Sequence, residues 1–261
     1  MKKNTKIWLS IACILIVVGL TLFTVALACC NWDFYKLNTT KLETVTHQPS
    51  ESFDSISIHV DTADITILPA SDGICKVVCR QWADQKYDVF VRDNTLTIQV
   101  NDIRKWYEYI GIHFGEAKIT VYLPENDYKR IDLKSSTGDM ALKHLSVGDL
   151  SITVSTGDVT MRDIRCQNLT TKGSTGDWDM WDVIAQEQIR IRRNTGDVEF
   201  QKCDAASIKI TTSTGDVEGS LLSEKVFITH TDTGDIHVPK TATGGICEIT
   251  TDTGDIEIRI H

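Results

Sequence analysis

The tripeptide Thr-Gly-Asp occurs seven times in this chain at an almost constant spacing, and no other feature restricts the possible folds so strongly. Successive copies are 19 or 20 residues apart. Exact repetition at a short period is typical of solenoids and related repeat architectures. The glycine and aspartate pairs of the seven copies are Gly138 and Asp139, Gly157 and Asp158, Gly176 and Asp177, Gly196 and Asp197, Gly215 and Asp216, Gly234 and Asp235, and Gly254 and Asp255.

Apolar residues recur at fixed positions around each of these aspartates. In the unit of Asp216, Ile208 and Ile210 precede the turn and Val217 follows it. Such alternation predicts two short β-strands per unit, each with one buried face. Glycine supplies a backbone conformation that other residues avoid, and Thr and Asp side chains stabilise turns. A unit of 19 or 20 residues leaves no room for a substantial crossover helix, so it predicts one coil of a parallel β-helix, about 4.8 Å from its neighbour.

The segment before the regular repeats also predicts strands. The stretch "DSISIHVDTADITI" reads as an eighth, degenerate coil with Asp64 in the Asp position. Strands are expected at 74–82, 86–92, 95–100 and 117–123, as antiparallel hairpins or as a cap over one end of the stack. The predicted fold is therefore all-β: a parallel β-helix or β-solenoid of about seven to eight coils of 19–20 residues, preceded by antiparallel hairpins and by one N-terminal transmembrane helix.

Residues 7–30 carry no charge and are long enough to span a membrane as a helix. Three lysines precede them, which places the N-terminus in the cytoplasm. We therefore expect a single-pass protein of the cell membrane. Its parts are a cytoplasmic tail (1–6), a transmembrane helix or uncleaved signal anchor (7–30), a juxtamembrane linker (31–52) and an extracytoplasmic β-solenoid domain (53–261). The small residues "ALA" at 26–28 keep a cleaved signal peptide open as an alternative.

Charge and cysteine content narrow the range of partners. Beyond residue 30 the chain carries 24 basic and 36 acidic side chains, a formal charge of −12. This charge disfavours nucleic acid and anionic lipid as partners. The five cysteines of this part are odd in number and lack a C-x-x-C pair of the metal-binding type. Cys166, Cys203 and Cys247 fall at apolar positions of the repeat, which favours three free thiols in the core.

Several features together resemble a known family. The apolar N-terminal segment, the "YLP" strand end at Tyr122–Pro124 and the serial Thr-Gly-Asp turns are similar to the toast-rack family of bacterial adhesin-like domains. The resemblance covers roughly residues 53–261. It implies a β-solenoid-like fold and a cell-surface setting that is often associated with envelope-stress systems. It implies no catalytic residues.

The column of aspartates raises the question of a metal site. Neighbouring carboxylates about 4.8 Å apart repel each other by roughly 1 kcal/mol in water and about 3.5 kcal/mol at an effective dielectric of 20. Backbone amides of the turns can offset this repulsion through charge-assisted hydrogen bonds. The alternative is a row of Ca²⁺ ions that bridges the coils along the Asp column. We expect the structural role, with no metal and no cofactor.

Three groups of residues are candidate binding sites. Trp181 falls on an outward position among aspartates, where it either stacks on a sugar ring or covers a corner. Arg190 and Arg192 also point outward, as a solvated basic patch or as part of a site that acts on polysaccharide. Trp106 and Tyr107 belong to an aromatic segment that either caps the open core or contacts a partner or the membrane.

These observations favour a binding module over an enzyme. The seven histidines show no zinc-ligand spacing, and the G-x-S-x-G motif is absent from the sequence. The last strand, Ile256–His261, is followed by no capping segment, so we expect it to form an open edge that pairs with a protein partner or a second copy. The alternative function is a polysaccharide-binding or polysaccharide-active β-helix protein of the cell envelope.

Overall fold

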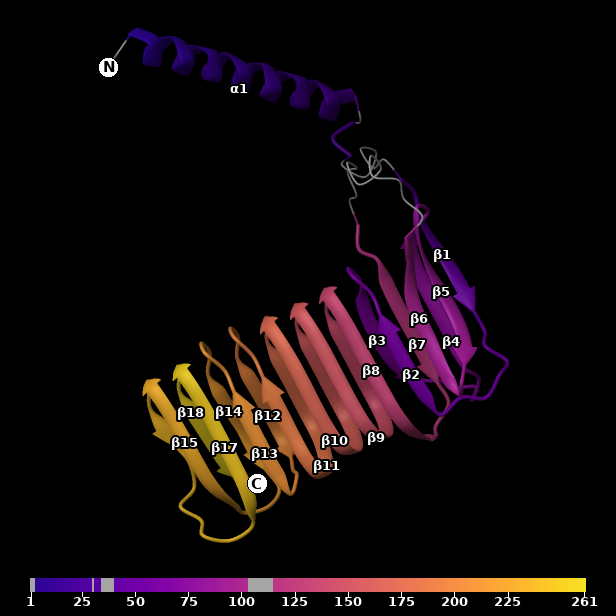
Figure 1. The fold of residues 1–261 in the computed structure, drawn as a ribbon, viewed down its shortest axis with the longest axis vertical. Coiled ribbons are helices and arrows are strands. Elements are labelled where there is room, and N and C mark those ends of the chain that lie inside the picture. Colours follow the sequence, from indigo (N-terminus) through magenta and orange to yellow (C-terminus); the bar gives the residue numbers. More distant parts are fainter. Residues whose placement is uncertain (1–2, 30, 34–39, 103–114) are drawn as a thin grey trace. The chain divides into compact units, whose positions relative to one another are not determined.

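A computed structural model describes residues 3–29, 31–33, 40–102 and 115–261 (Figure 1). It contains one helix followed by strands, which confirms the all-β class with a single apolar N-terminal helix. Its contacts divide the chain into two compact parts. One part holds residues 1–42 and 104–115, and the other holds residues 43–103 and 116–261, which we call the β domain.

Helix α1 (Lys3–Cys29) is long and apolar enough to cross a membrane. Its span from Lys6 to Cys29 has a mean hydropathy of 2.8. The hydroxyls of Ser10 and Thr21 donate to carbonyls four residues earlier, so these polar groups are satisfied within the helix. Internal satisfaction of polar groups is what a hydrocarbon environment requires. A membrane anchor and a signal sequence both fit this composition.

Eighteen strands follow within the described residues, and all belong to one hydrogen-bonded sheet. Their bounds are β1 (Leu42–His47), β2 (Ser55–His59), β3 (Asp64–Pro69), β4 (Lys76–Trp82), β5 (Gln85–Arg92), β6 (Thr95–Asp102), β7 (Lys118–Leu123), β8 (Asp127–Thr137), β9 (Met140–Thr156), β10 (Val159–Thr175), β11 (Trp178–Arg192), β12 (Val198–Cys203), β13 (Ser207–Thr211), β14 (Val217–Leu221), β15 (Lys225–Thr233), β16 (Ile236–His237), β17 (Gly245–Thr253) and β18 (Ile256–Ile260).

The strands form two layers with the core between them. Layer A runs β5, β6, β2, β8, then the second halves of β9, β10 and β11, then β13, β17 and β15. Layer B runs β1, β4, β7, β3, then the first halves of β9, β10 and β11, then β12, β14, β18 and β16. Figure 1 shows the resulting row of strands. Met180 and Phe200 of layer B meet Ile189, Ile208 and Ile210 of layer A around one small internal cavity.

Parallel pairing joins each repeat unit to the next in the central part of the stack. Met140 lies beside Val159, and Val159 lies beside Trp178, so equivalent residues form columns. The apolar columns expected from the sequence are buried there; Leu150 and Leu169 are each at most 1 % exposed. Burial of apolar side chains on this scale stabilises the fold by about 1.5–3 kcal/mol for each large residue.

Glycine is required at the Thr-Gly-Asp corner for two reasons. Gly157 has a φ of +147°, a conformation that L side chains rarely adopt. A Cβ atom there would also lie 2.2 Å from the carbonyl oxygen of Gly138 in the adjacent unit. The corners therefore stack so closely that only glycine fits.

The last two units do not stack in the order of the sequence. Strand β17 lies between β13 and β15, and β18 lies between β14 and β16. After β14 the chain leaves one position of the stack empty and forms β15 and β16 at the end of the stack. It then returns, and β17 and β18 occupy the empty position. The expectation that Ile256–His261 forms the open edge is therefore wrong, because both neighbours of β18 are present. The edge strands at this end are β15 and β16.

Two features accommodate the returning strand. Gly244 and Gly245 lead into β17, and Cβ atoms on them would lie 1.8 Å from the Glu224 carbonyl oxygen and 2.0 Å from that of Ala206. A pair of glycines therefore lets the chain pass between the segments already in place. Lys225 is buried at the start of β15, and its Nζ lies 2.5 Å from Oδ1 of Asp204, which precedes β13.

The opposite end of the domain ends in antiparallel strands. Strands β5 and β6 form the expected hairpin, which turns at Asp93 and Asn94 with positive φ at both residues. Strand β4 pairs antiparallel with β7 and β5, whereas β6 and β7 pair in parallel with β2 and β3. The degenerate unit around Asp64 is thus part of the stack. Strand β1 lies inside the stretch expected to be a linker.

Candidate functional site

The aspartates of the Thr-Gly-Asp turns form one continuous hydrogen-bonded column. The carboxylate Oδ1 of each aspartate except the last in the column accepts the backbone N–H of the aspartate in the next unit; for example, Asp158 donates to Asp139 at 2.9 Å. Anionic acceptors make such bonds about twice as strong as neutral ones. The order along the column is Asp64, Asp139, Asp158, Asp177, Asp197, Asp216, Asp255 and Asp235.

This arrangement occupies the carboxylates with backbone donors. Within the described part of the chain, no three His, Cys, Asp or Glu side chains are grouped so that they could hold a metal ion. The backbone amides of the turns are therefore the groups that offset the repulsion between neighbouring carboxylates in this column.

A buried arginine lies inside the stack beneath this column. The side chain of Arg193 is 2 % exposed, and its guanidinium carbon lies 5.2 Å from the centre of the Trp178 ring. Its Nη2 donates to the Thr195 carbonyl at 3.1 Å, while Nε and Nη1 have no hydrogen-bond partner among the described residues. Burial lowers the pKa of Arg193 to about 10, and nearby carboxylates, led by Asp177, act in the opposite direction.

A second corner lies five residues after each aspartate. In four successive units it is formed by a non-glycine residue with φ near +50°: His144, Asp163, Asp182 and Lys202. Asp and His adopt this conformation more readily than most residues. No glycine marks this corner in the sequence, and so it was not predicted.

A hollow with polar side chains lies beside this second corner, and we call it the corner pocket. It has a volume of about 680 Å³. It is built from the end of β3, the turn between β7 and β8, and the corners of β9 and β10. Its lining residues are Ile67, Leu68, Pro69, Leu123, Pro124, Glu125, Asn126, Asp127, Tyr128, Lys143, His144, Leu145, Ser146, Asp163 and Arg165.

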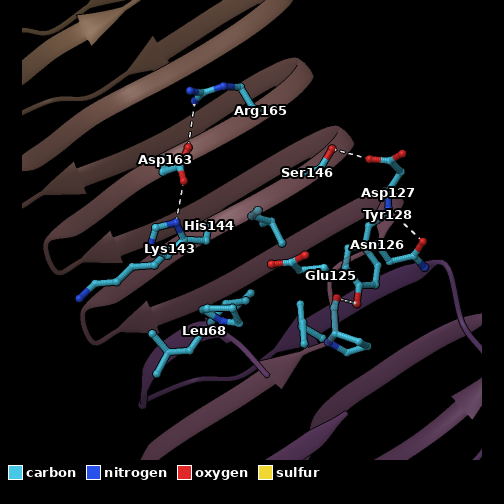
Figure 2. A pocket seen from close by; sticks show the side chains of 15 residues that line it. Leu68, Glu125, Asn126, Asp127, Tyr128, Lys143, His144, Ser146, Asp163 and Arg165 are labelled. Carbon is cyan, nitrogen blue, oxygen red and sulfur yellow. Dashed lines mark hydrogen bonds and ion pairs between the residues drawn. The ribbon is translucent and has the colours of Figure 1, made fainter. Parts of the chain in front are cut away.

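Ion pairs and hydrogen bonds fix several side chains of the corner pocket. Nδ1 of His144 lies 2.6 Å from Oδ2 of Asp163, whose Oδ1 lies 3.3 Å from Nη1 of Arg165 (Figure 2). The Ser146 hydroxyl donates to Oδ1 of Asp127 at 2.6 Å. These contacts link adjacent units, so they hold the wall of the pocket in one arrangement.

Other groups in the corner pocket remain available. Within the described residues, the side chains of Lys143 and Glu125 have no hydrogen-bond or ion-pair partner. Leu68 and Pro124 contribute apolar surface beside them. The pocket thus combines a free cation, a free carboxylate and fixed hydrogen-bonding groups. The sequence did not indicate this site, because its residues come from separate segments that only the parallel stacking brings together.

Trp181 lies on the outer face of layer B and is 50 % exposed. It borders a shallow hollow of about 220 Å³, with Lys202 Nζ 6.0 Å from its ring centre. Burial raises the pKa of the neighbouring Asp179, and the charges of Glu199 and Asp177 add to this effect. We call this hollow the Trp181 shelf; its lining residues are Thr160, Met161, Arg162, Asp179, Met180, Trp181, Glu199 and Gln201.

The other sequence candidates lie elsewhere. Arg190 and Arg192 are exposed on layer A, beside Lys209 and Thr211 of β13. The two layers separate them from Trp181, so the structure does not bring these three residues into one site. Trp106 and Tyr107 lie outside the described residues.

The five cysteines of the β domain are free and buried, which confirms the prediction for Cys166, Cys203 and Cys247. Their positions are Cys75, Cys79, Cys166, Cys203 and Cys247. Burial raises the pKa of the Cys166, Cys203 and Cys247 thiols to about 12. They contribute to the core as small apolar side chains.

Comparison with known proteins gives a family match over most of the chain. The model of the Toastrack DUF4097 family matches residues 53–261. No curated protein matches the chain. A solved structure of a "putative adhesin" from Bacteroides fragilis is 19 % identical, with a TM-score of 0.53, over 84 % of this chain and 97 % of that one. This likeness concerns the fold alone.

Two further solved structures are similar at a lower level. A "putative cell adhesion protein" from Clostridium sporogenes is 11 % identical, with a TM-score of 0.40, over 85 % of this chain and 100 % of its own. A "putative lipid binding protein" from Parabacteroides distasonis is 15 % identical, with a TM-score of 0.47, over 85 % of this chain and 98 % of its own.

Proposed function

The chain belongs to the Toastrack DUF4097 family, and from this premise we propose that it is a membrane-anchored, non-catalytic binding module. In this proposal α1 is an uncleaved single-pass anchor, and the β domain, a parallel β-solenoid, lies outside the cytoplasm. The charge-free apolar span and the three lysines before it support this orientation. The adhesion-related names of the solved relatives agree with a binding role at the cell surface, in a setting such as an envelope-stress system.

The anchor is tested by the mass of the mature protein. We expect the chain isolated from membranes to retain residues 3–29 by intact mass spectrometry. A mass that corresponds to a chain beginning after the "ALA" at 26–28 would show that a signal sequence has been cleaved. The β domain would then be an exported protein without this anchor.

The corner pocket is the observation that carries the binding role. Its ion-paired residues form a fixed wall, while Lys143 and Glu125 remain available as donor and acceptor. A site whose groups are already in place loses less entropy on binding. Mixed donors and acceptors beside small apolar surfaces suit a ligand rich in hydroxyl groups. We therefore propose that the ligand is a polysaccharide of the cell envelope.

The pocket is tested by co-sedimentation of the full chain, in detergent, with insoluble peptidoglycan. Lys143→Ala and Glu125→Ala should each weaken binding about tenfold, because a hydrogen bond to a charged group contributes about 1.5–3 kcal/mol. Lys172→Ala removes an exposed lysine from layer A and is the matched control, which should bind normally. Equal binding by all three variants would rule out the pocket as the site.

The Trp181 shelf supports a second candidate site for the same class of ligand. A half-exposed tryptophan beside carboxylates is a suitable surface for stacking a sugar ring. In the same assay, loss of binding with Trp181→Ala and normal binding with Lys143→Ala would place the ligand on the shelf. The opposite pattern would place it in the corner pocket.

A further inference from the structure

The two ends of the β domain are finished in different ways. At one end the parallel stack is followed by antiparallel strands β4 and β5. At the other end it stops on β15 and β16, which have strand neighbours on one side only among the described residues. An unprotected edge presents backbone N–H and C=O groups that a further strand can pair with.

The apolar columns of the domain are uncovered at this end. Ile256 is fully buried, whereas Ile236, at the same position in the terminal unit, is 41 % exposed. Phe227 and Val238 are half-buried, whereas Cys247 and Ile258, their counterparts in the inserted unit, are buried. The core is therefore open where the stack ends.

Two further large apolar side chains are exposed in this part of the chain. Leu222 is 41 % exposed and Ile228 is 56 % exposed, and both belong to the terminal unit or its approach. Exposed clusters of large apolar side chains on a soluble domain mark interaction sites. We call the surface formed by Leu222, Phe227, Ile228, Ile236 and Val238 the end surface.

The aspartate column is also incomplete here. Each earlier aspartate carboxylate accepts a backbone N–H from the next unit, and the last bond of the series runs from Asp235 to Asp255. Within the described residues, no N–H donates to the carboxylate of Asp235. The end surface therefore lacks a neighbour at its backbone edge, at its core and at its corner.

We propose that a second copy of this chain covers the end surface, edge to edge, about a two-fold axis perpendicular to the layers. Such an axis places β15 antiparallel to β15 of the second copy, and likewise β16. Antiparallel pairing centred on Thr229 sets Phe227 against Thr231 of the other copy, so inward residues face inward residues and the two cores join. A self-complementary patch of this kind is what a two-fold dimer requires.

Local charge favours a second copy over a charged partner. The five side chains of the end surface carry no charge, although the whole chain carries a formal charge of −9. Two copies therefore bring uncharged side chains together there, without the repulsion that acidic faces would produce. A strongly charged partner would meet no opposite charge within these five side chains. This inference does not depend on the proposed polysaccharide ligand.

The oligomeric state of the full chain in detergent, measured by native mass spectrometry, tests the proposal. The unmodified chain should be dimeric. Ile236→Lys should weaken the dimer about 30-fold or more, as expected when a central apolar contact is replaced by a charge. Ile74→Lys is the matched control, because Ile74 is 46 % exposed at a distance from β15 and β16 in the stack, and it should leave the dimer intact.

Two results would overturn the proposal. A monomeric unmodified chain would exclude the dimer, and a dimer that survives both Ile236→Lys and Ile228→Lys would place the contact elsewhere, for example between helices. Circular dichroism should show that the variants are folded, since both substituted side chains are exposed.

A photoreactive residue at position 230 on β15, used in intact cells, identifies the occupant. A product of twice the chain mass supports a second copy. A product with a different protein, or no protein product, contradicts it.

Discussion

Asp235 donates its backbone N–H to Oδ1 of Asp255 at 2.8 Å, although Asp235 comes 20 residues earlier in the chain. Asp255 in turn donates to Asp216 at 2.7 Å. The unit that comes last in the sequence therefore lies between two units that come before it in the sequence. The end of the stack cannot be complete until the C-terminal strand has been placed, so the final residues of the chain are part of the core of the domain.

The exchanged order predicts losses of stability of different size from the same substitution in two equivalent positions. Ile256→Ala removes a fully buried side chain and should lower the free energy of unfolding by about 2–5 kcal/mol. Ile236→Ala affects a 41 % exposed side chain and should cost less than about 1 kcal/mol. Denaturant unfolding measures both. Stacking in sequence order would reverse the two results.

The entry of the inserted strand should depend on Gly245. In Gly245→Ala, the new Cβ would lie 2.0 Å from the carbonyl oxygen of Ala206, so the backbone of β17 must shift. We expect a loss of about 2–4 kcal/mol, in the range of strained core substitutions. Gly73→Ala is the control: its φ is +70° but nothing lies within 4 Å, so its cost should stay near 1–2 kcal/mol. Similar losses in both variants would argue against crowding at Gly245.

The aspartate column should need an acceptor at each position more than a charge. Asp177→Asn retains a side-chain oxygen for the Asp197 N–H, which now donates at 2.9 Å. It should therefore change stability by less than about 1 kcal/mol, because the lost charge also relieves repulsion from neighbouring carboxylates. Asp177→Ala leaves the amide without its acceptor and should cost about 1–3 kcal/mol. Thermal unfolding with and without Ca²⁺ would show a shift only if cations bridge the column.

The buried thiols should resist alkylation until the domain unfolds. Burial raises the pKa of Cys166 from 9.0 to about 12, so the reactive thiolate is about 10³-fold rarer at pH 8 in the folded state. Peptide-level mass spectrometry after iodoacetamide treatment measures this protection. Rapid alkylation of Cys166 in the native domain at pH 8 would contradict the packing.

The same thiols predict how stability depends on pH. Between pH 9 and about 12 the unfolded state releases thiol protons that the folded state keeps, so the unfolded state binds fewer protons in this range. Stability should therefore fall as pH rises through this window. Replacing Cys166 with Ala should make the fall less steep.

The corners with glycine were open to prediction because their chemistry is local. Gly157 and Asp158 specify a turn that recurs in every regular unit, and their neighbours specify the buried columns. Trp181 was placed correctly on the outside because strand alternation decides it. These features depend only on residues a few positions apart.

The order of the last two units in the stack could not be predicted from local sequence. The turns at Asp235 and Asp255 have nearly the same sequence, so periodicity gives each the same place in a column and does not say which comes first in space. The glycine pair Gly244–Gly245 is the signal that marked the returning strand. The corner pocket was not predicted for another reason. Glu125, His144 and Asp163 come together only because their segments occupy neighbouring levels of the stack, and the sequence does not give the level of each segment.

Each aspartate of the column uses its amide toward one neighbouring unit and its carboxylate toward the other, so every internal junction is chemically the same. An in-frame duplication or deletion of one whole unit would leave the junctions on both sides unchanged. The height of the domain can therefore change in steps of about 4.8 Å without any new chemistry at the corners. A domain built this way can adjust how far its end surface lies from its other end by whole units alone.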